Sequence, residues 1–377
     1  MKILSVIAGI LLDDAMSKRI LNINRLLIEL GHQVHLVQYA EKKAWLKTGG
    51  NAVDLSVFDH SIVFSPKALT NLTHLRGLGK ENYDLMYGNT YGGAFWSILG
   101  KLKHVPLIYD MHGSAIEEHR LNTGNTQSLT GAIRLLSKTA VETAAISFSD
   151  RIVCVSNKMM LYLKKYNGGS SKKTYYVTNG VDLNLFKPVS DVDAYSLKRK
   201  LGLDGKFVFG YIGDTQKWQG LANFIYAAKL LRNPNVQFLV VGTNQNKTQK
   251  AGNLLFVPRV SHIQVPLYAG VCNVLVLPRP THPATEIAAP TKFAEYAAMG
   301  KPILTTNVGD AAELVTRYNC GLVTKKSAAV GLLEGFGSFT QKPVDLLREM
   351  GHNSRELAET EFDWNKIKWN LSRAIAL

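Results

Sequence analysis

The sequence predicts an α/β protein with two doubly wound domains in tandem, each built on a parallel sheet. Short apolar runs that read as buried strands alternate with helical segments along the whole chain, and this alternation is typical of parallel sheets. The strand series pauses near residue 177 and resumes near residue 207, with a turn-rich segment between. The 377 residues suit two domains of ordinary size, and 46% hydrophobic residues are enough for two full cores.

The first domain is predicted over residues 1–183. It opens with a strand at 2–8, an amphipathic helix at 17–30 and a strand at 34–38. The first dozen residues resemble a short signal peptide, but no convincing cleavage site follows, so we expect a buried first strand. Further strands are predicted at 61–64, 85–87, 107–109, 151–155 and 175–177, with a long helix at 129–145.

The second domain is predicted over residues 184–363. The hinge lies near 180–190, where Asn179-Gly180, Pro188 and Ser190 cluster. The terminal helix, 364–377, is assigned to the first domain. Ligands of such sheets bind beyond the carboxyl ends of the strands, and we expect the two domains to face each other across a cleft. Strands are predicted at 207–211, 236–241, 254–257, 274–277 and 303–305, with a helix at 221–231.

The charge balance favours an anionic partner. Lys and Arg outnumber Asp and Glu by 44 to 29, a formal net charge of +15. Nucleic acid, acidic lipid headgroups and phosphorylated substrates all fit such a charge. The excess is spread over both halves without a basic tail or an Arg-rich tract, so we expect no nucleic acid among the partners.

Cysteine content and hydropathy indicate the compartment. The three cysteines are too few and too scattered for a disulfide framework or a zinc site, so we expect a reducing, cytoplasmic environment. No apolar run approaches the roughly 20 residues that span a bilayer. Residues 158–173 begin as a basic amphipathic helix, which either lies on an anionic membrane or turns its apolar side to the core. Peripheral attachment to the inner face of the membrane is therefore one of our hypotheses.

The stretch 285–301 carries the clearest binding pattern. Pro290 and Thr291 indicate a helix start, which the threonine is suited to cap, and Gly300 marks the helix end. Free amides at a helix start attract phosphate, and Lys292 adds positive charge there. Glu295, one turn further, is placed to accept hydrogen bonds from sugar hydroxyls. On this stretch alone, an ordinary helix with a solvated Glu and Lys is an equal alternative.

The string Thr-Asn-Gly-Val-Asp-Leu-Asn-Leu-Phe-Lys-Pro at 178–188 is the most specific in the chain. It closely resembles the interdomain signature of the family 4 glycosyltransferases, retaining enzymes of the GT-B fold with two Rossmann-like domains. The resemblance covers essentially the full chain. It includes Cys-Val-Ser at 154–156, the loop 256–262 and the pattern Pro-x-Lys-x-x-Glu-Tyr at 290–296. It implies transfer of a sugar from a nucleotide donor to an acceptor, with the anomeric configuration kept.

The resemblance also implies where the donor binds. The second domain would hold the nucleotide, with Glu295 at the ribose hydroxyls and the amides of Thr291 and Lys292 at the diphosphate. Arg259 and Val260 would line the base pocket.

In the first domain, the resemblance places His112 near the donor sugar. This histidine follows a predicted strand, and Asp110 is either its partner or a cap of the following loop. A surface-loop histidine is the alternative. Asp13, Asp14 and Asp110 are our candidates for the acceptor side.

One departure from the family pattern concerns catalysis. The family usually has a glutamate eight residues before the helix glutamate, and that position is Ile287 here. The adjacent Glu286 is our candidate replacement. His112 and Glu286 are thus the predicted catalytic residues.

A second departure concerns the glycine-rich phosphate loop, which runs from Gly213 and ends in Trp-Gln-Gly at 218–220. Asp214 and Gln219 stand where the family usually has an Arg and a Lys. A diphosphate leaving group needs positive charge. We expect Lys217 and Lys292 to supply it, with Arg259 in reserve, although Lys217 could equally be a solvated loop residue.

No cofactor or metal is expected. Asp191-Val-Asp193 has the Asp-x-Asp form that binds metal in other transferases, but it follows the hinge and should open a surface helix. The leading hypothesis is a hexosyltransferase that uses a UDP- or GDP-sugar to extend a glycan or lipid-linked acceptor in cell-surface polysaccharide synthesis. The alternative, motivated by the two departures, is a catalytically degenerate protein that binds a nucleotide or a partner.

Overall fold

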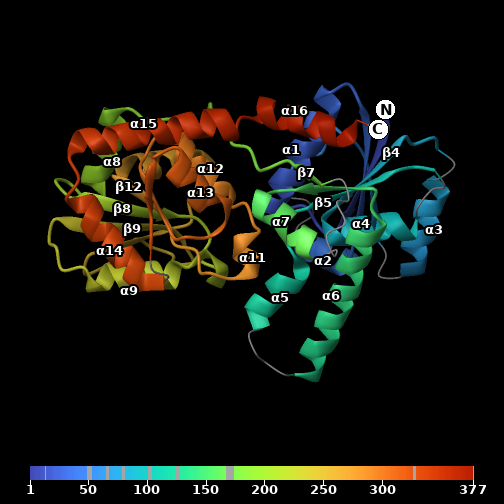
Figure 1. The fold of residues 1–377 in the computed structure, drawn as a ribbon, viewed down its shortest axis with the longest axis horizontal. Helices are drawn as coiled ribbons and strands as arrows, with labels where there is room; N and C mark the ends of the chain where they lie inside the picture. Colours follow the sequence, from blue (N-terminus) through green and yellow to red (C-terminus); the bar gives the residue numbers. More distant parts are fainter. Residues whose placement is uncertain are drawn as a thin grey trace. The chain divides into compact units, whose positions relative to one another are not determined.

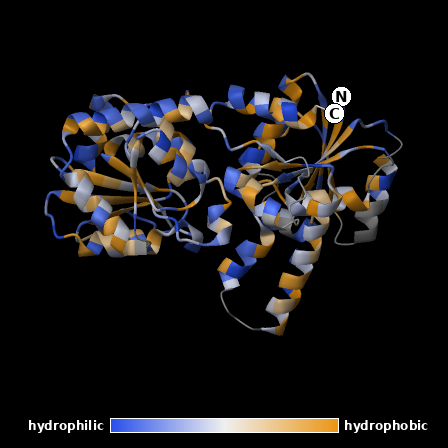
Figure 2. Ribbon diagram, in the orientation of Figure 1, coloured by the Kyte–Doolittle hydropathy of each residue, from blue (hydrophilic) through white to orange (hydrophobic). Residues whose placement is uncertain are grey.

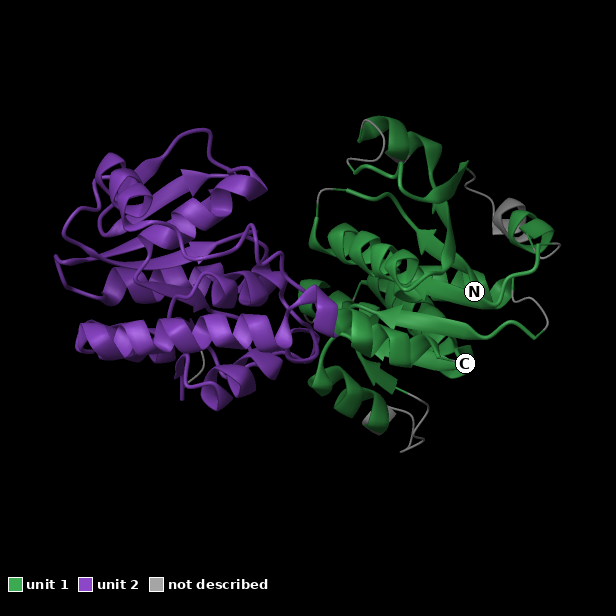
Figure 3. Cartoon of the chain, turned by 90° about the horizontal axis from the view of Figure 1, so that it is seen from above, with its two compact units in different colours: residues 1–178, 367–377 green, residues 179–366 purple. Residues whose placement is uncertain are grey.

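The computed structural model describes residues 1–12, 14–48, 53–64, 68–78, 81–100, 104–123, 128–166, 174–325 and 328–376. The chain forms two compact units (Figure 3). Unit 1 comprises residues 1–178 and 367–377, and unit 2 comprises residues 179–366. The sequence placed the first division at 183/184. The terminal helix begins at Trp364, so its first three residues belong to unit 2 and the rest, from Ile367, belongs to unit 1.

Unit 1 is a doubly wound sheet whose described strands all pair in parallel, in the order β3-β2-β1-β4-β5-β6-β7 (Figure 1). Its central strands are buried along their whole length, because helices cover both faces. Its strands are β1 (Lys2–Ala8), β2 (Gln33–Ala40), β3 (Asp59–Phe64), β4 (Leu85–Asn89), β5 (Leu107–Met111), β6 (Arg151–Cys154) and β7 (Thr174–Tyr176). Its helices are α1 (Ala15–Glu29), α2 (Lys42–Lys47), α3 (Ala68–Leu78), α4 (Thr90–Leu99), α5 (Ala115–Thr123), α6 (Leu129–Phe148), α7 (Asn157–Tyr166) and most of α16 (Trp364–Ile375).

Unit 2 repeats this design with the strand order β10-β11-β9-β8-β12-β13-β14, parallel except for β10. Its strands are β8 (Phe207–Ile212), β9 (Val236–Thr243), β10 (Gln249–Ala251), β11 (Leu254–Pro258), β12 (Val274–Leu277), β13 (Ile303–Thr305) and β14 (Gly321–Val323). Its helices are α8 (Asp191–Lys200), η1 (Lys217–Gln219), α9 (Leu221–Leu230), η2 (His262–Gln264), α10 (Val265–Val271), α11 (Pro283–Glu286), α12 (Thr291–Ala298), α13 (Gly309–Arg317), α14 (Ala328–Thr340) and α15 (Val344–Glu361).

The core of unit 2 lies on both faces of its sheet, since successive strand residues point to opposite sides. Val208 belongs to a cluster under α8, α10, α12 and α13, whereas Phe209 belongs to a cluster under α9 and α14. The second cluster is aromatic, with the ring centroids of Phe209 and Phe336 4.7 Å apart. Figure 2 shows hydrophobic strands inside both units and hydrophilic outer faces on most helices.

The strand order of each sheet determines where a crevice can form at the ends of its strands. In unit 2 the chain order reverses between β8 and β12, and in unit 1 it reverses between β1 and β4. Such switch points open a crevice at the carboxyl ends of the strands. The prediction of two doubly wound α/β domains is confirmed, and every predicted strand is present. The edge strands β10 and β14 were not predicted, because each has only three residues and neither is buried.

The basic helix at 158–173 is described only as far as Tyr166. In α7, Met159 and Leu163 are buried, so its apolar side faces the core. This agrees with the second of the two interpretations of this segment, in which the apolar side packs on the core. Residues 167–173 lie outside the described part of the chain. None of the described helices combines the length and the apolar run that crossing a bilayer requires.

Candidate functional site

The predicted donor-binding residues meet at the carboxyl edge of the sheet in unit 2. Gly213 directly follows β8, and Arg259 and Val260 directly follow β11. Glu286 ends α11, which comes after β12, and α12 begins at Thr291. The site is therefore assembled around the switch point between β8 and β12.

The first turn of α12 is open to an anion. The helix begins at Thr291 after Pro290, which has extended backbone angles and provides no side-chain cap. The threonine thus starts the helix but does not cap it, contrary to our expectation. Among the described residues, the amides of Thr291 and Lys292 have no hydrogen-bond acceptor. Free amides at the positive end of a helix are a ready anion site.

Lys292 points its ammonium group under the loop that starts at Gly213. The side chain is only 7% exposed, and its Nζ donates to the Tyr211 hydroxyl at 2.9 Å. A Cβ added to Gly213 would lie only 2.8 Å from this Nζ, so the amine occupies the space that a side chain at position 213 would need. Burial, reinforced by the charge of Arg279, lowers the pKa of Lys292 to about 7, although Glu295 and Asp214 oppose the shift. The site thus holds a buried amine that a negative ligand would help to protonate.

Arg279 is a second cation of this site that the sequence did not reveal. It follows β12, is 6% exposed, and is close enough to Lys292 to lower the pKa of that lysine. A basic residue two positions after the buried run 274–277 was the available signal in the sequence, because the carboxyl ends of the strands face the crevice.

Glu295 links α12 to the loop after β11. Its Oε1 lies 3.1 Å from Nε2 of His262, which opens η2. The side chain is 23% exposed, and its Oε2 has no hydrogen-bond partner among the described residues. From the sequence, His262 was named only as the last residue of the loop 256–262. Its pairing with Glu295 was not predicted, because the two residues are 33 positions apart in the chain. The carboxylate is therefore anchored by one oxygen and available through the other.

Glu286 and Ile287 have different environments. The Glu286 Oε2 accepts a 2.8 Å hydrogen bond from the Gly309 amide at the start of α13. Ile287 is 3% exposed and belongs to the core. The position of the family's usual glutamate is thus a buried apolar one. Glu286 is held at a helix terminus, and its catalytic role stays a prediction.

The remaining predicted donor-side residues differ in their exposure to solvent. Lys217, on η1, and Arg259 are exposed, whereas Val260 is half-buried and packs on the core. The loop geometry needs a glycine at its end: Gly220 has φ +74°, and a Cβ there would lie 1.7 Å from the Pro278 carbonyl oxygen. Whether Lys217 and Arg259 contact a ligand stays a prediction.

Unit 1 holds a separate buried charge cluster at the end of β5. Nε2 of His112 lies 3.0 Å from Oδ2 of Asp110, and the other oxygen of Asp110 lies 2.8 Å from a guanidinium nitrogen of Arg19. Arg19 also donates to the carbonyls of Val177 and Thr178, at 2.9 and 3.0 Å. Burial alone would raise the pKa of Asp110, but the charges of Arg19 and His112 outweigh it and hold this pKa well below its ordinary value. Asp110 is therefore an ionised partner of His112.

This cluster gives Asp110 its partners and leaves the acceptor-side assignments as predictions. Asp110 is completely buried between Arg19 and His112, which suits the role of a partner that orients His112, and its acceptor-side role stays a prediction. His112 itself is 13% exposed. Asp14 caps α1 by accepting from the Ser17 amide at 2.7 Å, and its acceptor-side role stays a prediction. Asp13 lies outside the described residues.

Two family models match the chain. The model described as Glycosyltransferase Family 4 matches residues 16–185, and the model described as Glycosyl transferases group 1 matches residues 194–357. The matches fall on unit 1 and unit 2 respectively. Together with the relatives below, they support a glycosyltransferase family of the family 4 type with the GT-B fold.

Curated relatives match over part of their length. A putative colanic acid biosynthesis glycosyl transferase of Escherichia coli is 29% identical over 43% of this chain and 42% of its own. A capsular polysaccharide biosynthesis glycosyltransferase of Staphylococcus aureus is 26% identical over 51% of each. The chain thus spans about half the length, or less, of these relatives.

A solved structure matches the whole fold. The Anabaena protein HepE, solved in complex with UDP-glucose, has a TM-score of 0.71 over 100% of this chain and 99% of its own. Its sequence is 18% identical, so the likeness concerns the fold.

Proposed function

We propose that this chain, with both domains of a family 4 type glycosyltransferase, is a working hexosyltransferase that retains the anomeric configuration. The donor would be a UDP- or GDP-sugar and the acceptor a growing glycan or a lipid-linked saccharide of cell-surface polysaccharide synthesis. The biosynthetic roles in the names of the relatives support the pathway, and the UDP-glucose complex of HepE supports a nucleotide-sugar donor. The observation that carries the proposal is the buried Lys292 beside the open first turn of α12, with Glu295 one turn on.

The donor would bind with its diphosphate at the start of α12. The two free amides would donate hydrogen bonds to the phosphate oxygens, and Lys292 and Arg279 would supply charge where the family's usual Arg and Lys are missing. The free oxygen of Glu295 accepts hydrogen bonds from the ribose hydroxyls. Two buried cations stabilise a leaving diphosphate without a metal, which is why we propose a metal-independent reaction.

The chemical step needs little covalent help from the protein. The acceptor hydroxyl attacks the anomeric carbon, the bond from that carbon to the diphosphate oxygen breaks, and the leaving phosphate takes the hydroxyl proton on the same face. The protein mainly positions substrates and stabilises charge. His112, with its Nε2 turned to Asp110, would hydrogen-bond a hydroxyl of the donor sugar, and Glu286 would position the sugar from the α11 side.

Release of UDP from UDP-glucose, and of GDP from GDP-mannose, tests this function. We expect slow release without an acceptor, lost in Glu295→Ala and kept in the control Glu356→Ala, whose exposed carboxylate lies on α15. A chain that binds UDP or GDP in a thermal-shift assay, but releases none from any donor, would instead be the degenerate binding protein. No thermal shift with UDP, GDP or ADP would reject nucleotide binding altogether.

Peripheral membrane attachment is a further part of the proposal, and we propose α6 rather than α7 as the membrane contact. Leu129, Ile133 and Leu136 are 78%, 59% and 71% exposed, at helical spacing on one side of α6. α5 and α6 extend away from the sheet of unit 1 (Figure 1), and Arg134 is exposed on the same helix. Apolar side chains beside a cation suit the interface of an anionic bilayer, where a lipid-linked acceptor would be found.

Vesicle sedimentation tests this attachment. Replacing Leu129, Ile133 and Leu136 by glutamine should weaken binding to phosphatidylglycerol-containing vesicles at least tenfold. Leu46→Gln, which removes a 69% exposed leucine from α2, is the matched control and should bind like the parent. Equal binding by all three proteins would reject α6 as the membrane contact.

A further inference from the structure

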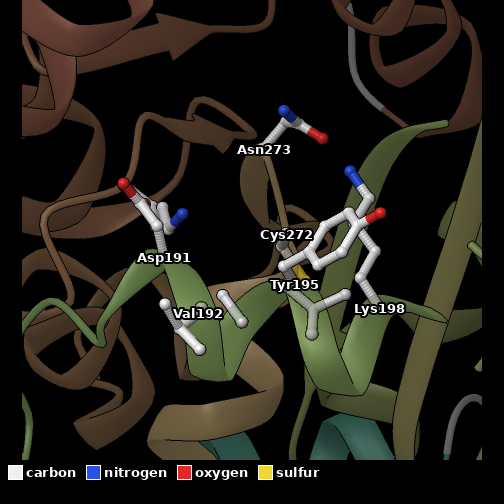
Figure 4. A pocket seen from close by; sticks show the side chains of 10 residues that line it. Asp191, Val192, Tyr195, Lys198, Cys272 and Asn273 are labelled. Carbon is white, nitrogen blue, oxygen red and sulfur yellow. The ribbon is translucent and has the colours of Figure 1, made fainter. Parts of the chain in front are cut away.

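Unit 2 contains a cavity at the amino ends of its strands, whereas the candidate donor residues lie at the carboxyl ends. Its volume is about 490 Å³, and its walls come from α8, from residues 270–273 and from Lys301 (Figure 4). Residues 272 and 273 directly precede β12, and Lys301 lies just before β13. The cavity therefore lies at the amino ends of these strands, whereas Gly213 and Arg279 follow the carboxyl ends of β8 and β12.

Two lysines face this cavity without a partner. Lys198, on α8, and Lys301 are both half-buried, and neither ammonium group has an ion pair or hydrogen bond among the described residues. Burial lowers the pKa of both, and the charge of Lys198 lowers that of Lys301 further. Asp191, the carboxylate that lines the cavity, is exposed and opposes the shift of Lys301 only in part. Partly buried positive charges are normally paired with negative groups, so these two lysines are suited to bind an anion.

The rest of the lining favours an anion with an organic group attached. On α8, Tyr195 and Val192 are 52% and 77% exposed beside the cavity, and they offer an aromatic ring and an aliphatic surface (Figure 4). On the other wall, the Asn273 Oδ1 accepts from the Val208 amide at 2.8 Å, which fixes the carboxamide. The Cys272 thiol is buried, and burial raises its pKa to about 12, so it does not act as a thiolate.

We propose that this cavity is a second ligand site of the chain, which binds a phosphomonoester. Lys198 and Lys301 hold the phosphate, and Tyr195 and Val192 contact its organic group. A phosphomonoester carries close to two negative charges at neutral pH, which match the two ammonium groups, whereas a carboxylate carries one. The site does not depend on the function proposed for the donor edge.

Phenyl phosphate is the probe that tests the site, by isothermal titration calorimetry. All titrations use a Lys292→Met background, so that phosphate binding at the donor site is weakened. Lys198→Gln and Lys301→Gln should each weaken binding at least tenfold, and Lys198→Arg should largely restore it. Lys200→Gln, which changes an exposed lysine of α8 outside the cavity, should have no effect.

A second arm distinguishes a soluble phosphate from a lipid headgroup. Flotation with vesicles of phosphatidic acid in phosphatidylcholine is compared for the same variants. Lysine-dependent binding in either arm supports the site and identifies the source of the phosphate. The proposal is overturned if neither probe binds, or if the lysine variants bind both probes as tightly as the background protein.

Discussion

Lys292 is the residue with the clearest chemical consequence. Its pKa is lowered from 10.5 to about 7, mainly by burial, so near neutral pH the free amine and the ammonium ion coexist. A bound diphosphate favours the ammonium ion and raises this pKa. The same shift means that the unfolded chain binds more protons than the folded one between about pH 7 and 10.5. The contribution of Lys292 to the free energy of unfolding therefore becomes more favourable as the pH rises through that window.

UDP binding should consequently take up a proton at pH 8. Calorimetry in two buffers of different ionisation enthalpy measures this uptake, and we expect between half a proton and one proton per UDP, as a shift through a single group allows. UDP affinity should fall as the pH rises above about 7. Lys292→Met should remove the uptake and weaken UDP binding roughly 10- to 100-fold, the loss of one charged hydrogen bond. A binding enthalpy that is independent of buffer in the parent protein would contradict this account.

Asp110 should control the state of His112. Asp110→Asn removes the charge that faces Nε2 and removes the carboxylate that neutralises the buried Arg19, which should cost about 3–5 kcal/mol of stability. Because the folded pKa of Asp110 is depressed, its stabilising contribution is full above its ordinary value of 3.8 and is lost as the pH falls below it. We expect an altered ¹⁵N tautomer signature for His112 and a lower kcat with little change in KM for the donor. An unchanged His112 spectrum would show that the contact does not orient the ring.

At the residue scale, the sequence could predict which candidate residues lie together only where one short segment contains them. Lys292 and Glu295 share a helix, so their spacing already placed them on the first turns of α12. Arg279 and His262 reach the same site from other strands, and only the topology brings them there. The complete burial of Asp110 could not be predicted in the same way, because it depends on β5 and on Arg19, which is 91 residues away in the sequence.

At the scale of elements, the start of α12 is the part that a nucleotide should depend on most. Thr291→Pro removes one of the two free amides but keeps the helix, because proline is favoured at the first helical position. Pro290 already has the extended conformation that a residue before proline adopts.

We expect Thr291→Pro to weaken UDP binding about tenfold, the loss of one hydrogen bond to a charged group, with unchanged helicity by circular dichroism. Thr291→Ala retains the amide and should bind UDP like the parent protein. If Thr291→Pro binds UDP as tightly as Thr291→Ala, the diphosphate does not lie on this amide.

Elements with a strong apolar pattern were predictable, and weak ones were not. Every strand buried on both faces appears where its apolar run predicted it, within a few residues. The strand β10 has only exposed residues, so nothing in its composition distinguishes it from a polar loop. Amphipathicity showed that α7 has an apolar side but not that the core covers it. The exposed apolar side of α6 looks the same in sequence as a buried one.

At the scale of the whole molecule, the division of the candidate residues between the two units was predictable because each strand series is continuous. The donor residues all belong to unit 2, and the Arg19–Asp110–His112 cluster belongs to unit 1. The charge distribution inside each unit could not be predicted from the sequence. It depends on the pairing of strands that are far apart in the chain.

UDP should therefore stabilise the two units unequally. A ligand at 100 times its Kd stabilises the state that binds it by roughly 2.7 kcal/mol, and all contacts proposed for UDP lie within residues 213–295. Hydrogen exchange with and without UDP measures this for each segment. We expect slower exchange at the loop 213–220 and the start of α12, and unchanged exchange along β5 and α1, because the nucleotide contacts no residue of unit 1 in this proposal. Addition of an intact UDP-sugar should then extend protection to the residues around His112. Protection of unit 1 by UDP alone would show that the nucleotide, and not only the sugar, is bound by both units.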